Sequence, residues 1–332
     1  MPSFVTAVVT EILEERAGLQ RMATDGGRAY ALVDLIGPVA VGDRVVLNTT
    51  AVGLGLGTGG WHVVHWNLAR EEWSQPGPGH IMKLRYTSLQ ADTGAAEERY
   101  PDLPEQLDDL PVVACTLHSQ VGIVASVARS MRSEARIVYV MTDGAALPLA
   151  LSNLVHDLRR AKVLDATVTA GHAFGGDLEA VSLPSALALA RHVADADLVV
   201  VGMGPGVVGT GSSLGTTAVE AAGIVDTVAA LGGRAALCLR ASAADPRGRH
   251  QGISHHSATV LRLARTRPAI PLPSDLAAEV DDAVAVDPPD VAKVLDDLGL
   301  GVVTSMGRGP ADDPMFFATA GAAGAWLGTV GK

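Results

Sequence analysis

From residue 111 onward the chain alternates short apolar runs with stretches of helical period, and this alternation constrains the fold more than any other feature. The apolar runs cover residues 112–117, 136–141, 166–170, 197–201, 235–240, 269–272 and 301–305. Helical periodicity extends to about residue 132 and then covers 148–160, 185–193, 216–231, 257–267, 290–298 and 314–327. Apolar strands that alternate with helices are typical of a mainly parallel sheet covered on both faces. Residues 111–332 are therefore predicted to form a doubly wound, Rossmann-like α/β domain.

The first 75 residues show a different pattern, with short alternating runs separated by tight turns. The runs cover residues 4–13, 19–24, 28–35, 44–52 and 61–68, and Asp25-Gly26-Gly27 supplies a hairpin turn. They predict a small closed all-β barrel of the SH3-like or OB-like kind. The glycine-rich run 53–60 is expected to be a flexible loop, although a backbone-lined anion pocket is an alternative. Residues 76–110 are proline-containing and acidic, which predicts a linker with one extended segment, 80–90, paired to a strand.

The charge balance excludes several classes of partner. The chain has 36 acidic and 25 basic residues, a net charge of −11, and no basic stripe for nucleic acid or an anionic membrane. No secretory n-region and no apolar run of about 18 residues is present, so we expect a cytoplasmic protein without a transmembrane helix. Cys115 and Cys238 lie in apolar runs and are expected to be reduced, buried thiols. A charged fraction of only 18% favours a homo-oligomer with a buried interface, although an Ala/Val-rich genome would also explain it.

Polar residues gather where the predicted strands end. Each strand exit carries His, Asp, Ser or Arg, and every exit except the first also carries glycine. The segments are 117–120, 142–144, 171–179, 202–213, 241–256 and 306–313. In an open α/β sheet, ligands bind beyond the carboxyl ends of the strands. One-sided polar enrichment therefore predicts a composite small-molecule site built from several loops.

The centre of this predicted site is the glycine-rich loop 202–211, which follows a strand and precedes a helix. It contains GxGxxG at Gly204, Gly206 and Gly209. Pro205 removes one amide donor, the helix starts late, and Arg240 stands where a dinucleotide fold has an acid, so a phosphate-bearing ligand or nucleotide is favoured over a dinucleotide. A loop needed only for tight strand-to-helix geometry is the alternative. The residues predicted to cradle the anion are Gly202, Gly204, Gly206, Gly209, Thr210, Gly211 and Ser212.

A second cluster, residues 245–257, holds three histidines and two arginines. Arg240, Arg247 and Arg249 are predicted to neutralise a phosphate or carboxylate. A divalent metal is the sharper hypothesis, with His172, Asp177, His250 and His255 as candidate ligands. The spacing matches no metal signature, and adjacent His255 and His256 are expected to point about 100° apart on a helix. Side chains that position an organic anion, or a helix cap at Ser254, are the alternatives.

Candidate catalytic residues follow from the same strand exits. His172 with His255 or His256 is expected to transfer protons, and Asp143 or Asp177 to orient an imidazole or act as a base. No serine stands in a nucleophile elbow.

Taken together, the segments LNTTAVGLGLGTGGWH, GHIMKLRYTSLQ, MTDGAALPLALS, GHAFGGDLEAV, GMGPGVVGTGSSLGT and RGRHQGISHHS resemble an uncharacterised bacterial family that is defined by a domain of unknown function. The resemblance covers nearly the whole chain, which implies that the barrel and the α/β domain occur together. It implies no activity, cofactor or catalytic residue.

These observations predict an enzyme, a transferase or hydrolase, that binds a small phosphate- or carboxylate-bearing molecule. A non-enzymatic nucleotide or metabolite sensor is the first alternative. A metal-dependent hydrolase that uses the histidine cluster is the second.

Overall fold

The computed structural model describes residues 1–56, 59–301 and 303–330. The chain divides into two compact units, Met1–Gly94 and Ala95–Lys332. The division falls inside the segment 76–110. Among the described residues, no helix is both long and apolar enough to cross a membrane.

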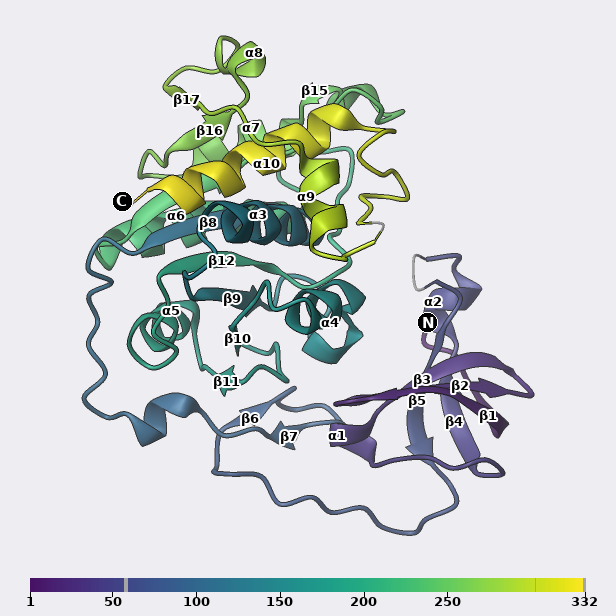
Figure 1. Ribbon diagram of the computed structural model, residues 1–332. Helices are drawn as coiled ribbons and strands as arrows, with labels where there is room; N and C mark the ends of the chain where they lie inside the picture. Colours follow the sequence, from purple (N-terminus) through teal and green to yellow (C-terminus); the bar gives the residue numbers. More distant parts are fainter. Residues whose placement is uncertain (57–58, 302, 331–332) are drawn as a thin grey trace. The chain divides into compact units, whose positions relative to one another are not determined.

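The first unit contains a closed five-stranded barrel, as predicted (Figure 1). Its strands run in the order β1-β2-β3-β5-β4, and β1 pairs with both β2 and β4. The β3–β5 pair is parallel, and a short helix precedes β4, which is the OB-like rather than the SH3-like arrangement. The elements are β1 (Phe4–Arg16), β2 (Leu19–Thr24), β3 (Gly27–Leu32), α1 (Val33–Ile36), β4 (Arg44–Asn48), α2 (Thr50–Gly53) and β5 (His62–Asn67).

Alternating side chains fill the barrel, among them Val9, Met22, Val45 and Leu47, which are all buried. The extended segment predicted over 80–90 forms only β6 (Met82–Lys83), which pairs with β7 (Ala91–Asp92). The glycine-rich run 53–60 ends α2 at Gly53, and its residues 57 and 58 lie outside the described part of the chain.

The second unit is built on a six-stranded, entirely parallel sheet with the order β11-β10-β9-β12-β8-β13. The predicted doubly wound α/β fold is thus confirmed. The strands are β8 (Pro111–Cys115), β9 (Ile137–Thr142), β10 (Ala166–Thr169), β11 (Leu178–Glu179), β12 (Leu198–Met203) and β13 (Arg234–Cys238). The helices between them are α3 (His118–Met131), α4 (Asn153–Arg160), α5 (Leu183–His192) and α6 (Glu220–Ala230).

Two apolar clusters cover the two faces of this sheet, because neighbouring residues of each strand point in opposite directions. Val113, Ile137 and Tyr139 pack with α3 and α4, whereas Val112 and Val138 pack with α5 and α6. Figure 1 shows these helix pairs on opposite sides of the sheet. The remaining elements are β14 (Ala241–Ser242), β15 (Gly252–Ile253), α7 (His255–Leu263), β16 (Ile270–Leu272), α8 (Ser274–Ala277), β17 (Ala283–Ala285), α9 (Val291–Asp297) and α10 (Pro314–Thr329).

The strand predicted over 301–305 is wrong for its described residues, and residue 302 lies outside them. Ser305 and Arg308 instead exchange backbone hydrogen bonds in a tight turn. The outer edge of β13 is already paired with Ala269, which donates to Ala235 and accepts from Leu237. This pairing occupies the centre of the outer edge of β13.

Candidate functional site

The strand order places a topological switch point between β9 and β12. After β9 the chain passes through α4 on one face to β10, whereas after β12 it passes through α6 on the opposite face to β13. Connections that diverge from neighbouring strands leave a crevice at their carboxyl ends, and ligands bind there in open α/β sheets. A pocket of about 700 Å³ lies at this position. Its lining includes Thr142, Asp143, Gly144, Gly171, Thr217, Glu220 and Thr227.

Two carboxylates define the chemistry of this pocket. The Thr142 hydroxyl donates to Glu220 Oε1 at 2.6 Å, and the backbone amide of His172 donates to Asp143 Oδ2 at 2.9 Å. A Cβ at residue 144 would overlap the Glu220 carboxylate, and a Cβ at residue 171 would overlap that of Asp143. Glycines at these two positions therefore leave room for the carboxylates.

Glu220 holds its proton unusually well. Burial raises its pKa from 4.5 to about 7; the Thr142 hydrogen bond opposes the shift, and the negative charge of Asp143 adds to it. The carboxyl group can therefore gain or lose a proton near neutral pH, as a general acid or base must.

The glycine-rich loop folds as a hairpin from Val208 to Thr217. Thr217 N donates to Val208 O, and Thr210 N donates to Gly215 O at 2.7 Å. The amides of Ser212 and Gly215 donate to the Thr210 and Ser212 hydroxyls. These bonds use amides that a phosphate cradle would need, and α6 begins only at Glu220, with an acid in its first turn.

Four of the five glycines in the loop 202–211 are explained by packing or by backbone conformation. A Cβ at Gly204 would overlap the Ala146 carbonyl oxygen, and one at Gly202 would lie 3.2 Å from Cys115 Cβ. A Cβ at Gly209 would lie 2.9 Å from His256 Cε1. Gly206 has a φ of +101° and open space around it, and Gly211 is exposed. The loop therefore contacts the histidine cluster at Gly209.

Two of the three predicted arginines are already paired with one carboxylate. Asp245 is 1% exposed and contacts Arg240 at 2.7 Å and Arg247 at 2.9 Å. Arg308 lies 3.7 Å from Asp245 and contacts Asp313 at 3.3 Å. The Arg247 hydrogen bond is the main cause that holds the pKa of Asp245 well below its usual range. Arg249 is exposed. The network contains three guanidinium groups and two carboxylates, so it carries one excess positive charge.

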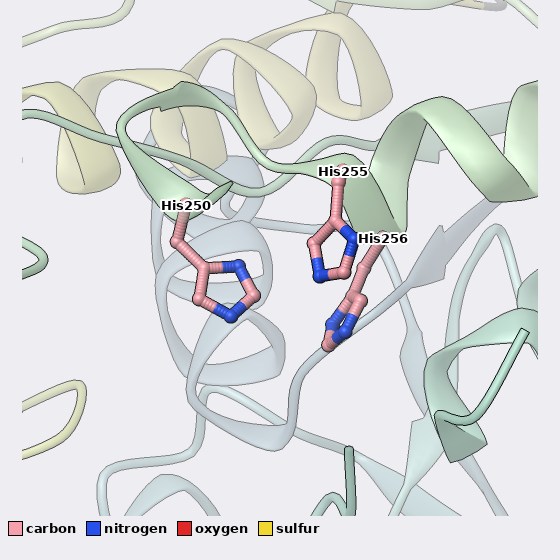
Figure 2. Close-up of side chains that lie close together, drawn as sticks. All are labelled: His250, His255 and His256. Carbon is pink, nitrogen blue, oxygen red and sulfur yellow. The ribbon is translucent and has the colours of Figure 1, made fainter. Parts of the chain in front are cut away.

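The structure brings His250, His255 and His256 together (Figure 2). Their ring centroids lie 5.1 Å (His250–His255), 4.8 Å (His250–His256) and 4.3 Å (His255–His256) apart. Adjacent His255 and His256 were expected to diverge on a helix, but at the first turn of α7 their ring centroids lie only 4.3 Å apart. Ser254 caps α7 by accepting from His256 N.

The surroundings of all three imidazoles disfavour their charged forms. Burial lowers the pKa of His250 to about 3 and that of His256 to about 4, and the neighbouring arginines add to both shifts. Burial and the charges of Arg249 and Arg240 lower the pKa of His255 as well.

His172 and Asp177 are not members of this histidine group. Asp177 Oδ2 accepts from the amide and the hydroxyl of Thr167, and Oδ1 pairs with Arg159. These contacts tie the segment that precedes β11 to β10. The backbone amide of His172 donates to Asp143, and its neighbour Gly171 lines the pocket.

A buried serine–histidine contact elsewhere is structural. His118 Nε2 lies 2.7 Å from Ser152 Oγ, which also accepts from Val155 N and caps α4. Ser152 is 3% exposed, and its hydroxyl is used in the cap of α4.

Sequence reasoning missed Glu220 and Arg308. In the sequence Glu220 is one acid in the first turn of a helix, a position where acids are ordinary. Arg308 lies in the predicted strand exit 306–313, but it was not singled out among the arginines expected to bind an anion. The available signal for Glu220 was its position after the strand β12, the same signal that pointed to Asp143.

A family model described as "Protein of unknown function (DUF3866)" matches residues 28–324. The chain belongs to this family. The match extends from β3 to α10 and so includes parts of both units. No curated protein and no solved structure matches the chain.

Proposed function

We propose that this protein is an enzyme that acts on a small molecule bound in the pocket at the β9–β12 switch point. The observation that carries the proposal is Glu220, a carboxyl group with a pKa near 7 inside a pocket of about 700 Å³. Titratable groups with shifted pKa values in such pockets are candidates for acid–base catalysis. Glu220 is the proton carrier in this proposal; burial keeps its proton affinity high, and the charge of Asp143 adds to that effect.

The pocket favours a substrate whose reacting end is uncharged or cationic, because two carboxylates repel an anion. The hydroxyl protons of three lining threonines are already donated within the protein, so these oxygens can only accept hydrogen bonds from a polar group of the substrate. The three residues are Thr142, Thr217 and Thr227. A phosphate or carboxylate elsewhere on the substrate suits the arginines that follow β13. Strands β12 and β13 are two positions apart in the sheet, which is roughly 10 Å.

A ligand panel with Glu220→Gln as the matched variant tests this function. Small polar metabolites with and without phosphate are screened by thermal shift, and those that bind are followed for turnover by mass spectrometry. Loss of an acid–base group typically lowers a rate by about 10²–10⁴-fold. We therefore expect Glu220→Gln to keep binding and to lose turnover by that factor, whereas the exposed Glu105→Gln keeps both.

Two results would contradict the proposal. Equal turnover by Glu220→Gln and the native protein removes Glu220 from the chemistry. A ligand that binds at the pocket and is never converted favours the sensor alternative instead.

A further inference from the structure

Three imidazole rings from one short segment meet with no carboxylate or thiolate among them. One ring nitrogen from each of His250, His255 and His256 can be chosen so that all lie within 4.8 Å of one another. Figure 2 shows the rings gathered on the same side of the segment that carries them. Among residues 1–56, 59–301 and 303–330, this is the one group of three or more His, Cys, Asp or Glu side chains close enough to share a metal ion.

Three ring nitrogens of this group, from His255 and His256, are buried and have no hydrogen-bond partner in the described part of the chain. His256 is 5% exposed, and both of its ring nitrogens are buried without a hydrogen bond. Nε2 of His255 is in the same state. A buried polar atom without a partner destabilises the folded state, because it has lost its hydrogen bonds to water. Three such atoms in one cluster point to a ligand that the nitrogens bind.

A hydrogen-bond partner also orients the ring of His250 so that one nitrogen can bind a ligand. Its Nδ1 lies 2.8 Å from Ser254 Oγ, the hydroxyl that also caps α7. When Nδ1 donates to this oxygen, the lone pair of Nε2 is free for a metal, which is how outer partners set the tautomer of metal-binding histidines. His250 is 1% exposed, so its ring is held by packing as well.

The donor set selects the class of metal. Neutral imidazoles suit zinc, cobalt, nickel, copper and iron, whereas magnesium and calcium prefer oxygen. Zn–N bonds of about 2.0–2.1 Å place the nitrogens of a tetrahedral site roughly 3.3 Å apart. To reach that spacing from at most 4.8 Å, the side chains must rotate so that the nitrogens move closer together by up to about 1.5 Å. Three protein ligands also leave one coordination position open, as in catalytic rather than structural zinc sites.

The surrounding charges favour an anion at the open position. Arg240, Arg247 and Arg308 outnumber the carboxylates of Asp245 and Asp313, and three neutral ligands leave the charge of the metal uncompensated. Gly209 lies against His256, so the glycine-rich loop lies beside this position.

We propose that His250, His255 and His256 bind one divalent transition-metal ion and leave one coordination position open to an anion. The proposal uses no residue of the Glu220 pocket, so it can hold or fail independently of the proposed function.

Cobalt and zinc binding to the full chain test this site. The protein is dialysed against chelator, and Co²⁺ is titrated in while the visible absorption of four-coordinate cobalt is followed. Zn²⁺ affinity is measured by competition with a chromogenic chelator. We expect one ion per chain, no comparable binding of Mg²⁺ or Ca²⁺, and a change in the cobalt spectrum when phosphate or azide is added.

Ligand variants identify the residues. His250→Ala and His255→Gln are each expected to weaken Zn²⁺ binding by about 100-fold or more, since even outer partners of a metal ligand contribute 10–100-fold. The exposed His156→Gln on α4 is the control and keeps the native affinity. Because His250 is buried and its loss can unfold the protein, the partly exposed His255 provides the second variant, and circular dichroism verifies that each variant is folded.

The absence of stoichiometric binding to the folded native chain would overturn the proposal. Unchanged Zn²⁺ affinity in folded His255→Gln would overturn it as well. A cobalt spectrum that does not respond to either anion would overturn the open coordination position.

Discussion

Glu220 links a single side chain to the pH dependence of the whole protein. Its pKa rises from 4.5 to about 7 on folding, so the folded state binds a proton that the unfolded chain releases between these pH values. Stability from this group is therefore fully present below pH 4.5 and is lost as the pH rises through 7. A shift of this size corresponds to about 3 kcal/mol.

We expect Glu220→Gln to be more stable than the native protein at pH 8 by about 2–3 kcal/mol, and equally stable near pH 4.5. The side-chain amide of the glutamine keeps an oxygen that can accept the Thr142 hydrogen bond, and the substitution removes the buried negative charge of Glu220. Urea denaturation at pH 5, 6.5 and 8 measures the difference.

The control for this prediction is Glu105→Gln, a carboxylate on the exposed segment before β8. The difference in unfolding free energy between Glu105→Gln and the native protein should not change between pH 5 and pH 8. A constant offset between Glu220→Gln and the native protein at all three pH values would mean that Glu220 does not titrate near neutrality.

At the scale of elements, α10 depends on glycine to reach its position. The helix is buried over most of its length and packs on α3. A Cβ at Gly324 would lie 2.6 Å from Val124 O and 2.8 Å from Val127 Cβ. The two helices therefore meet at a distance that only a residue without a side chain permits.

We expect Gly324→Ala to destabilise the protein by about 1–3 kcal/mol, because overpacking outweighs the gain in helix propensity. Gly223→Ala on α6 is the matched change, since a Cβ there meets nothing within 4 Å. It should stabilise the fold by up to about 1 kcal/mol. If α10 packs as described, the urea midpoint falls for Gly324→Ala and rises for Gly223→Ala, each relative to the native protein. A shift of both midpoints in the same direction would contradict that packing.

Helices were easier to predict than short strands at this scale. The periodic stretches correspond to α3 to α7, α9 and α10, because each helix buries one side or is apolar throughout. The two-residue strands β11, β14 and β15 carry too few residues for any alternation to be read. The run 301–305 is apolar enough for a strand, but strand formation also needs a partner edge, and Ala269 occupies the one beside β13.

At the scale of the whole molecule, the chain consists of two units, each with its own apolar interior. Residues 74–80, between β5 and β6, are exposed and have no regular structure. Exposed irregular segments are the preferred sites of proteolysis.

We predict that limited proteolysis cuts first within residues 74–80 and leaves the α/β unit intact. Mass spectrometry of the early fragments should find a large C-terminal fragment that begins in this range. A first cut between residues 111 and 272, where the parallel sheet and its helices lie, would contradict this division of the chain.

The sequence by itself determined the fold class and the edge of the sheet at which polar residues gather. Apolar periodicity depends on local geometry, and in a parallel sheet every strand ends at the same edge. Asp143 and the arginines were therefore predicted to lie there before any contact was known.

Only the tertiary structure decided which of these residues meet. The strand order makes β9 and β12 neighbours, and that pairing places Glu220 beside Thr142 and Asp143. The backbone before and within the first turn of α7 turns the three histidine rings toward one another, although helical spacing alone predicts that His255 and His256 diverge. Contacts between residues distant in sequence depend on strand order and loop path, which no local periodicity encodes.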